Sequence, residues 1–303
     1  MLKSHLYNAK NAEGNLAFLM SAVTETDMNI KLVALDLDDT TLKSDSTLAE
    51  ETYTALVEAA KAGIEIVVAS GRAFTSLPKE VLDIEGVNYA ITSNGSAIEM
   101  AKTGERIYSK KLPEGVAREI LHSFPNAIFE CFIEGQPYCP REYIEDPVSF
   151  GCSREYIGYV KTTRKPVENM PAFIEENIDR LDSIDVVCSS PQVKHEVYAK
   201  GKAIPNAYVT SSTPRLVEFA AADAGKGKTL RWLCSKLGIK PENTAAFGNG
   251  DNDADMLIFA GLGVAVKNGT DYCRESADYV CEANDDLGVA KTLYKIIKEE
   301  SIL

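Results

Sequence analysis

Short apolar runs alternate with more polar stretches at both ends of the chain. Near the N-terminus, apolar runs at 32–36, 64–69 and 89–92 predict strands, and the segments between them predict helices at about 48–62 and up to Leu82. This βαβαβ order predicts a parallel sheet with right-handed crossovers. The same order returns late in the chain, with predicted helices at 229–237, 254–260 and 286–298 around predicted strands at 245–247 and 263–266.

The middle of the chain has a different pattern. It predicts helices at 114–124 and near 172–181, and short hairpin-like strands at 127–133, 185–189 and 193–198. Such segregated strands and helices are typical of α+β structure. We therefore predict an α/β protein in which residues 28–111 and 214–303 form a discontinuous core domain, 112–213 form an inserted α+β domain, and 1–27 form an N-terminal extension.

Composition narrows the possible partners. The chain has 303 residues, 45% of them hydrophobic, and a formal net charge of −13, which disfavours nucleic acid and means that any phosphorylated ligand needs a local cation. Seven cysteines without a Cys-x-x-Cys pair, together with only three histidines, give a zinc site little support and favour free thiols in a reducing cytoplasm. No apolar run reaches the ~20 residues that a membrane-spanning helix needs, so we expect no membrane partner and a cytoplasmic location.

Charged side chains crowd the end of the first predicted strand. Asp36, Asp38 and Asp39 follow the apolar run 32–35, and ligands of open α/β sheets bind just beyond the carboxyl ends of such strands. Asp36 and Asp38 point the same way if the strand geometry persists, so they repel each other and need a cation or a shared proton. Mg²⁺ suits such oxygen ligands. The alternative is an ordinary acidic turn after a strand.

Other predicted strand ends carry polar groups as well. Ser70 offers a hydroxyl to a phosphoryl oxygen, and Lys226 offers a positive charge that offsets the carboxylates. Asn249, Asn252 and Asp253, in a run of six Gly, Asn and Asp residues, offer oxygen ligands to a metal or to its waters.

Each of these has a simpler interpretation. Ser70 could belong to a turn, Lys226 could be a solvated lysine, and the segment 248–253 resembles a calcium loop superficially but lacks the terminal Glu. The segment 225–229 suggests a phosphate-binding P-loop, which we reject because Ala222 occupies the position of its first glycine.

Taken together, these motifs resemble the haloacid dehalogenase superfamily and specifically its Cof-like phosphatases. The resemblance covers nearly all of the chain from residue 28 onwards and includes four motifs in order, with a large insertion between the second and the third. The matching residues are Asp36-Leu-Asp38-Asp-Thr40, Ser70 within 67–72, Lys226 within 225–230, the segment 248–257 and the turn Thr92-Ser-Asn94-Gly95.

The resemblance implies a Rossmann-like parallel-sheet core, an inserted cap domain of the C2 (type IIB) kind and the following residue roles. Asp36 would be the nucleophile and Asp38 the general acid and base. Mg²⁺ would be held by Asp36, by the backbone carbonyl of Asp38 and by the fourth motif through Asn249 and Asp253. Ser70 and Lys226 would bind the phosphoryl group, Thr40 would steady the first loop, and Arg72, Asn94, Gly95 and Asn252 would contribute to substrate binding.

One position departs from the family pattern. Asn249 stands where the family usually has Asp. A neutral carbonyl oxygen binds Mg²⁺ less strongly than a carboxylate, so we expect a lower metal affinity unless Asp251 or Asp253 compensates.

We therefore expect a Mg²⁺-dependent phosphatase that hydrolyses a small phosphorylated metabolite, a sugar phosphate being one candidate, through an aspartyl-phosphate intermediate. A phosphotransferase or phosphomutase with the same intermediate is an alternative, and so is a non-catalytic regulator that binds a phosphorylated ligand. Several polar or aromatic residues of the inserted domain are candidates for contacting the leaving group, namely Glu134, Tyr138, Arg141, Tyr143 and Arg164.

Overall fold

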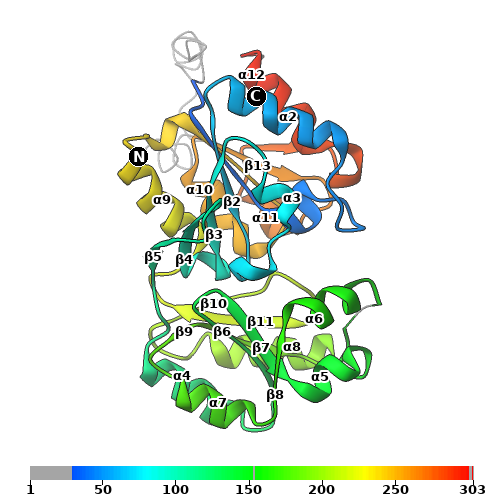
Figure 1. Cartoon of the computed structure of the whole chain (residues 1–303), viewed down its shortest axis with the longest axis vertical. Coiled ribbons are helices and arrows are strands. Elements are labelled where there is room, and N and C mark those ends of the chain that lie inside the picture. The colour runs from blue at the N-terminus through cyan, green and yellow to red at the C-terminus, as the bar shows by residue number, and fades with distance from the viewer. Residues whose placement is uncertain (1–28, 153, 300–301, 303) are drawn as a thin grey trace, which may run out of the picture.

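Two β-sheets organise the chain. The computed structural model describes residues 29–152, 154–299 and 302, and Figure 1 shows one sheet with its helices above a second sheet with its own helices. We call the eight-stranded sheet the core sheet and the six-stranded sheet the cap sheet. The predicted extension 1–27 lies outside the described residues.

The core sheet is parallel over most of its width. Its strand order is β14-β13-β12-β1-β2-β3-β4-β5, and every neighbouring pair from β14 to β3 is parallel, whereas β3–β4 and β4–β5 are antiparallel. The predicted parallel-sheet core is therefore confirmed, while β4 and β5 form an antiparallel edge that the pattern did not predict. The strands are β1 (Leu32–Leu35), β2 (Glu65–Ala69), β3 (Val87–Thr92), β4 (Ala97–Met100), β5 (Arg106–Ser109), β12 (Thr244–Gly248), β13 (Leu262–Val266) and β14 (Tyr279–Cys281).

Helices cover both faces of the core sheet. Successive side chains of a strand point to opposite faces, so Val33 and Leu35 pack with one pair of helices and Leu32 and Ala34 with another. The first pair is α2 (Glu50–Lys61) and α12 (Gly288–Ile297), and the second is α9 (Lys226–Leu237) and α10 (Ala254–Phe259). Two short helices, α3 (Lys79–Leu82) and α11 (Asp271–Glu275), complete this layer arrangement.

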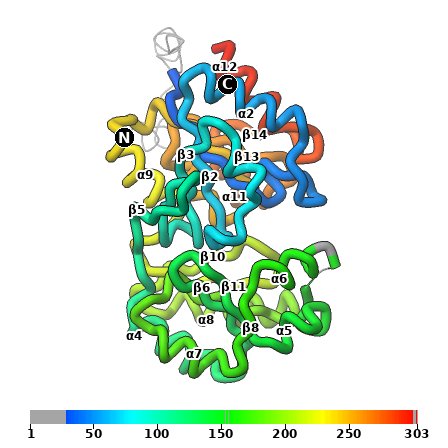
Figure 2. Tube along the Cα trace, in the orientation of Figure 1, coloured from blue at the N-terminus to red at the C-terminus, as the bar shows by residue number. Residues whose placement is uncertain are grey.

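The cap sheet has the order β10-β11-β9-β6-β7-β8 and is antiparallel except for the pair β7–β8. Apolar side chains on one of its faces pack against α4 (Glu114–Ser123), α7 (Met170–Glu176) and α8 (Pro191–Gly201). Figure 2 shows the chain passing between the two sheets near β5 and again near β11. The remaining elements are β6 (Ile128–Ile133), β7 (Gln136–Pro140), β8 (Lys165–Val167), β9 (Leu181–Val187), β10 (Ala207–Thr210), β11 (Leu216–Ala221), α5 (Arg141–Glu145) and α6 (Ile157–Thr163).

Two predictions for the middle of the chain were wrong in detail. The predicted strand 193–198 is part of helix α8, which begins where the Ser190 hydroxyl accepts a hydrogen bond from the Val193 amide at 3.2 Å and where Pro191 occupies the first turn. Strand β11 was not predicted, and it belongs to the cap sheet. The cap sheet thus continues to Ala221, beyond the predicted boundary at residue 213. The division into a core domain and an inserted domain stays a prediction, with the end of the inserted domain moved to about Ala221.

Two predictions about the rest of the chain can be compared with the structure. None of the seven cysteines forms a disulfide bond within the described residues. A search of that same part of the chain finds no helix that is both long and apolar enough to cross a bilayer.

Candidate functional site

The site lies where the carboxyl ends of neighbouring core strands meet. Strand β1 lies between β2 and β12, so the residues that follow these strands come together although they are far apart in sequence. Asp36 directly follows β1, and its backbone amide donates to the Phe247 carbonyl of β12 at 3.0 Å. The Thr41 hydroxyl donates to the Asp36 carbonyl at 2.6 Å and so fixes the turn that presents the Asp36 side chain.

Lys226 bridges two of the predicted carboxylates. Its ammonium lies 2.7 Å from Asp36 Oδ1 and 2.6 Å from Asp253 Oδ1, and its side chain is completely buried. Lys226 reaches this position because α9 begins at it, directly after Gly225, whose φ of 123° suits glycine. The structure therefore brings together the predicted residues of the first, third and fourth motifs.

The charges of this group are strongly coupled. Burial and the neighbouring charge of Asp253 raise the pKa of Asp36 to about 7, although Lys226 acts in the opposite direction. Burial alone would lower the pKa of Lys226, but the carboxylates of Asp253 and Asp36 outweigh it and raise that pKa, so the ammonium stays charged. A fixed positive charge beside Asp36 suits the binding of a phosphoryl group.

The first loop connects Asp36 to a second ion pair. The Thr40 hydroxyl donates to Asp36 Oδ2 at 2.8 Å, which orients the carboxylate. Asp38, two residues after Asp36, accepts from both Nε and Nη2 of Arg72, at 2.8 Å and 2.5 Å. The Ser70 hydroxyl in turn accepts from the Arg72 backbone amide at 3.1 Å, so Ser70 orders the turn that carries this guanidinium.

The fourth motif folds around Asp253. Its Oδ2 accepts from the backbone amides of Asn249 and Gly250, both at 2.9 Å, while its Oδ1 accepts from Lys226. Asn252 donates from its side-chain amide to Asn94 Oδ1 at 3.0 Å. Asp251 instead accepts from the Thr270 hydroxyl at 2.6 Å.

Gly95 has a packing role that the sequence did not indicate. A Cβ atom at this position would overlap with the backbone of Gly225, and the φ of Gly95 is +89°. Next to it, the Asn94 carbonyl accepts from the Gly225 amide at 3.0 Å and the Gly95 carbonyl accepts from the Thr229 hydroxyl at 2.6 Å. This turn therefore holds the start of α9, and with it Lys226, in place.

The donor set suits a hard cation at one part of the site. Asp36, Asp38 and Asn249 line the same cavity and offer oxygen atoms, which Mg²⁺ prefers. Asp253 fits less well, because its two oxygens already accept from Lys226 and from two backbone amides. Within the described residues, no group of three or more His, Cys, Asp or Glu side chains is placed to hold a metal ion. A site with few carboxylates would bind Mg²⁺ weakly and leave positions for water or phosphate oxygens.

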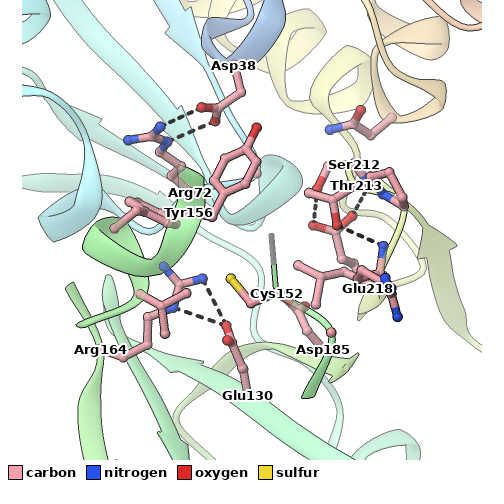
Figure 3. Close-up of a pocket in the computed structure, with 18 of the residues that line it drawn as sticks. Asp38, Arg72, Glu130, Cys152, Tyr156, Arg164, Asp185, Ser212, Thr213 and Glu218 are labelled. Atoms are coloured by element: carbon pink, nitrogen blue, oxygen red, sulfur yellow. Dashed lines mark hydrogen bonds and ion pairs between the residues drawn. The ribbon is translucent and has the colours of Figure 1, made fainter. Parts of the chain in front are cut away.

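A cavity of about 610 Å³ connects these residues to the cap sheet. Figure 3 shows Asp38 and Arg72 on one side of it and Glu130, Arg164, Asp185 and Glu218 on the others. Of the predicted leaving-group residues, Tyr143 and Arg164 line the cavity, whereas Glu134, Tyr138 and Arg141 do not. Of the core residues, Ser70, Asn94, Lys226 and Asp253 are buried and do not line it.

Sequence reasoning missed the acidic residues of the cap sheet. Glu130, Asp185 and Glu218 all line the cavity. Each interrupts an apolar strand, which is the signal that could have identified them, because a charged residue inside an apolar run is rarely buried without a partner or a function. Tyr159 was missed as well, although its ring lies 4.4 Å from the guanidinium carbons of both Arg72 and Arg164.

Comparison with known proteins settles the family. A model of the haloacid dehalogenase-like hydrolase family matches residues 33–293. The chain belongs to this family. The resemblance inferred from the motifs is therefore confirmed.

Curated relatives and a solved structure agree with this family assignment. Phosphatase YwpJ of Bacillus subtilis is 28% identical over 286 residues, which cover 88% of this chain and 100% of that protein. The 5-amino-6-(5-phospho-D-ribitylamino)uracil phosphatase YcsE of Bacillus subtilis is 26% identical over 273 residues, covering 90% of this chain and 98% of that protein. A solved haloacid dehalogenase-like hydrolase from B. subtilis matches with a TM-score of 0.76 and 26% identity, covering 88% of this chain and 99% of that chain.

A further solved structure supports the fold alone. The subclass IIB sugar phosphatase BT4131 matches with a TM-score of 0.73 at 22% identity, covering 88% of this chain and 99% of that chain. The fold is thus shared with a protein of this subclass.

Proposed function

We propose that this protein is a Mg²⁺-dependent phosphatase that hydrolyses a small phosphorylated metabolite. The observation that carries the proposal is the buried lysine between two carboxylates, with Lys226 within 2.7 Å of both Asp36 and Asp253. A buried ammonium of this kind gives a phosphoryl group a positive charge to bind beside a potential nucleophile. The names of the relatives, which are phosphatases, agree with it.

The chemistry has two steps. In the first, a carboxylate oxygen of Asp36 attacks phosphorus, the bond from phosphorus to the ester oxygen breaks, and the leaving alcohol takes a proton from Asp38. In the second, Asp38 accepts a proton from water, the water oxygen bonds to phosphorus, and the bond between phosphorus and Asp36 breaks, which releases inorganic phosphate. Lys226 stabilises the negative charge in both steps, and Thr40 holds Asp36 through the 2.8 Å hydrogen bond.

Other residues would prepare the site. Arg72 holds the Asp38 side chain through two hydrogen bonds, so the acid and base is positioned before substrate arrives. Asp36, the backbone carbonyl of Asp38 and Asn249 would hold Mg²⁺, which would supply charge neutralisation between the carboxylates and the phosphate. Residues of the cap sheet close the opposite side of the cavity and would exclude water from the reacting atoms.

The experiment is a phosphate-release assay on purified, chelator-treated protein. An aryl phosphate and a panel of phosphorylated metabolites are incubated with and without added Mg²⁺, with water as the only acceptor. We expect Mg²⁺-dependent release of inorganic phosphate that equals substrate consumption. Asp36→Asn should abolish it, whereas Asp83→Asn, at a mostly exposed aspartate, serves as the matched control and should not.

Two results would contradict the proposal. Substrate consumption without matching phosphate release, restored only by an added alcohol acceptor, would indicate a phosphotransferase or phosphomutase. Absence of turnover in folded protein under every condition would indicate a regulator that only binds a phosphorylated ligand.

A further inference from the structure

Three acidic residues form a row across the centre of the cap sheet. In the strand pairing, Glu130 of β6 lies opposite Asp185 of β9, and Asp185 lies opposite Glu218 of β11. Cross-strand partners share a face of the sheet, and the opposite face packs against helices α4, α7 and α8. All three carboxyl groups therefore point to the cavity side, as Figure 3 shows.

The row is buried and only partly satisfied. The exposed fractions of Glu130, Asp185 and Glu218 are 0%, 3% and 4%. Glu130 Oε2 accepts from Arg164, but Glu130 Oε1 has no hydrogen-bond partner within the described chain. Glu218 accepts from the backbone amide and the hydroxyl of Ser212.

Asp185 lies at the centre of the row, and the nearby charge of Arg164 favours its ionised form. Its side chain is nearly inaccessible, yet it lines the cavity. Burying a polar group without a partner is unfavourable, because its contacts with water are lost and not replaced. Glu130 Oε1, which faces the cavity side of the sheet and has no hydrogen-bond partner in the described chain, is therefore a group whose partner can be a ligand.

The cations around the cavity are already engaged. Arg72 is paired with Asp38 and Arg164 with Glu130, while Arg215 donates to the backbone carbonyls of Cys188 and Ser189. Within the described residues, no salt bridge joins Asp185 or Glu218 to a cation, although the charge of Arg164 lowers the pKa of Asp185 and that of Lys226 lowers the pKa of Glu218. The cap wall of the cavity therefore presents acidic groups that a bound cation can still engage.

Burial is the main influence on the pKa values of these acids. Burial raises the pKa of Asp185 well above its usual value, and the charges of Glu218 and Glu130 raise it further. Burial also raises the pKa of Glu218. A bound cation would favour the ionised form of both acids. Their negative charges would then contribute to its binding.

We propose that the row Glu130–Asp185–Glu218 binds a protonated amine on the leaving group, so that the substrate is an amino-substituted phosphate monoester. An ammonium brings a full positive charge and up to three hydrogen-bond donors to three carboxyl groups, whereas a hydroxyl brings one donor and no charge. The aromatic side chains of Phe132 and Tyr143, which also line the cavity, are compatible with a cation. The inference rests on the proposed phosphatase function, because it describes the leaving group of that reaction.

The test compares three substrates that differ only at one substituent. Glucosamine 6-phosphate carries an ammonium where glucose 6-phosphate carries a hydroxyl and N-acetylglucosamine 6-phosphate carries a neutral amide. We expect kcat/KM for the amine to exceed that for either of the others by about tenfold or more, the usual scale of a charge-assisted contact in a partly buried site. The preference should disappear in Asp185→Asn and shrink in Glu218→Gln, which keep the shapes of the side chains.

Glu196→Gln is the matched control. Glu196 is exposed on α8, and the variant removes one negative charge from the same part of the chain without touching the cavity. It should keep the full preference for the amine. Loss of the preference in this control as well would assign it to overall charge and overturn the proposal.

The remaining outcomes separate this inference from the proposed function. Equal kcat/KM for all three hexose phosphates, with normal phosphate release, would overturn the amine site and leave the phosphatase intact. A preference that persists in both Asp185→Asn and Glu218→Gln, with the melting temperature confirming that the variants are folded, would overturn the assignment to the row. Absence of hydrolysis of any ester would instead refute the proposed function.

Discussion

Replacing Lys226 by Met tests the electrostatic centre of the site. The substitution removes a buried ammonium and leaves the carboxylates of Asp36 and Asp253, whose exposed fractions are 5% and 0%. Removing one partner of a buried ion pair costs about 3–5 kcal/mol, because it leaves an uncompensated buried charge. In proteins of about this size, each kcal/mol of lost stability lowers the melting temperature by about 2–4 °C. We therefore expect the melting temperature to fall by about 6–20 °C at pH 7.

The sign of the pH dependence follows from the same contacts. The pKa of Asp36 is already raised to about 7 with Lys226 present, and removing the ammonium raises it further. When the pKa of a carboxyl is higher in the folded state than in the unfolded state, its contribution to stability is fully present at pH values below the unfolded pKa. That contribution is lost as the pH rises through the folded pKa. The deficit of the Met variant should therefore be smallest near pH 4 and largest above pH 7.

The assay is thermal unfolding followed by circular dichroism between pH 4 and pH 8. Lys228→Met is the matched control, since it makes the same replacement two residues along α9 at an exposed position whose ammonium donates to the Ala222 carbonyl. We expect a change below about 1 kcal/mol for the control. Equal melting temperatures for Lys226→Met and the wild type at pH 7 would refute the reasoning.

Three further predictions concern other parts of the site. Asn249→Asp should keep or raise Mg²⁺ affinity, because a carboxylate replaces a neutral oxygen, and isothermal titration that shows a clear loss would count against Asn249 as a ligand. Thr40→Val removes the 2.8 Å hydrogen bond to Asp36 Oδ2 and should lower kcat by about tenfold, and an unchanged kcat would deny Thr40 its positioning role. Asp185→Asn should be more stable than the wild type at pH 7 in thermal unfolding, because burial raises the pKa of Asp185 and this acid therefore costs stability as the pH rises above its unfolded pKa. The two proteins should converge near pH 4, and equal stability at both pH values would contradict the raised pKa of this buried acid.

The core of the fold was predictable because its strands are apolar on both sides. Residues 32–35 and 66–69 are buried against helices on both faces of the core sheet, so each appears as a continuous apolar run. The cap sheet gave a weaker signal, since its strands face helices on one side and a polar cavity on the other. Helix α8 was mistaken for a strand, because only Val197 and Gly201 among its residues are buried and it therefore lacks an apolar stripe.

The site was predictable only as far as local motifs reach. Asp36, Lys226 and Asp253 belong to short motifs, and the structure places them within hydrogen-bond distance. The pairing of Asp38 with Arg72 depends on the adjacency of β1 and β2 and on one rotamer, which no motif specifies. The acidic row of the cap sheet depends on the register of three strands, and that register is set by long-range pairing rather than by local sequence.

The most direct test of the central claim is to trap the phosphorylated enzyme. The protein is mixed with excess substrate and Mg²⁺, quenched in acid within the first turnover, digested, and its peptides are analysed by mass spectrometry. We predict a phosphoryl group on the side chain of Asp36 that hydroxylamine removes, as expected for an acyl phosphate. Absence of that group from the Asp36 peptide under conditions of rapid turnover, or its presence on another residue, would contradict the account.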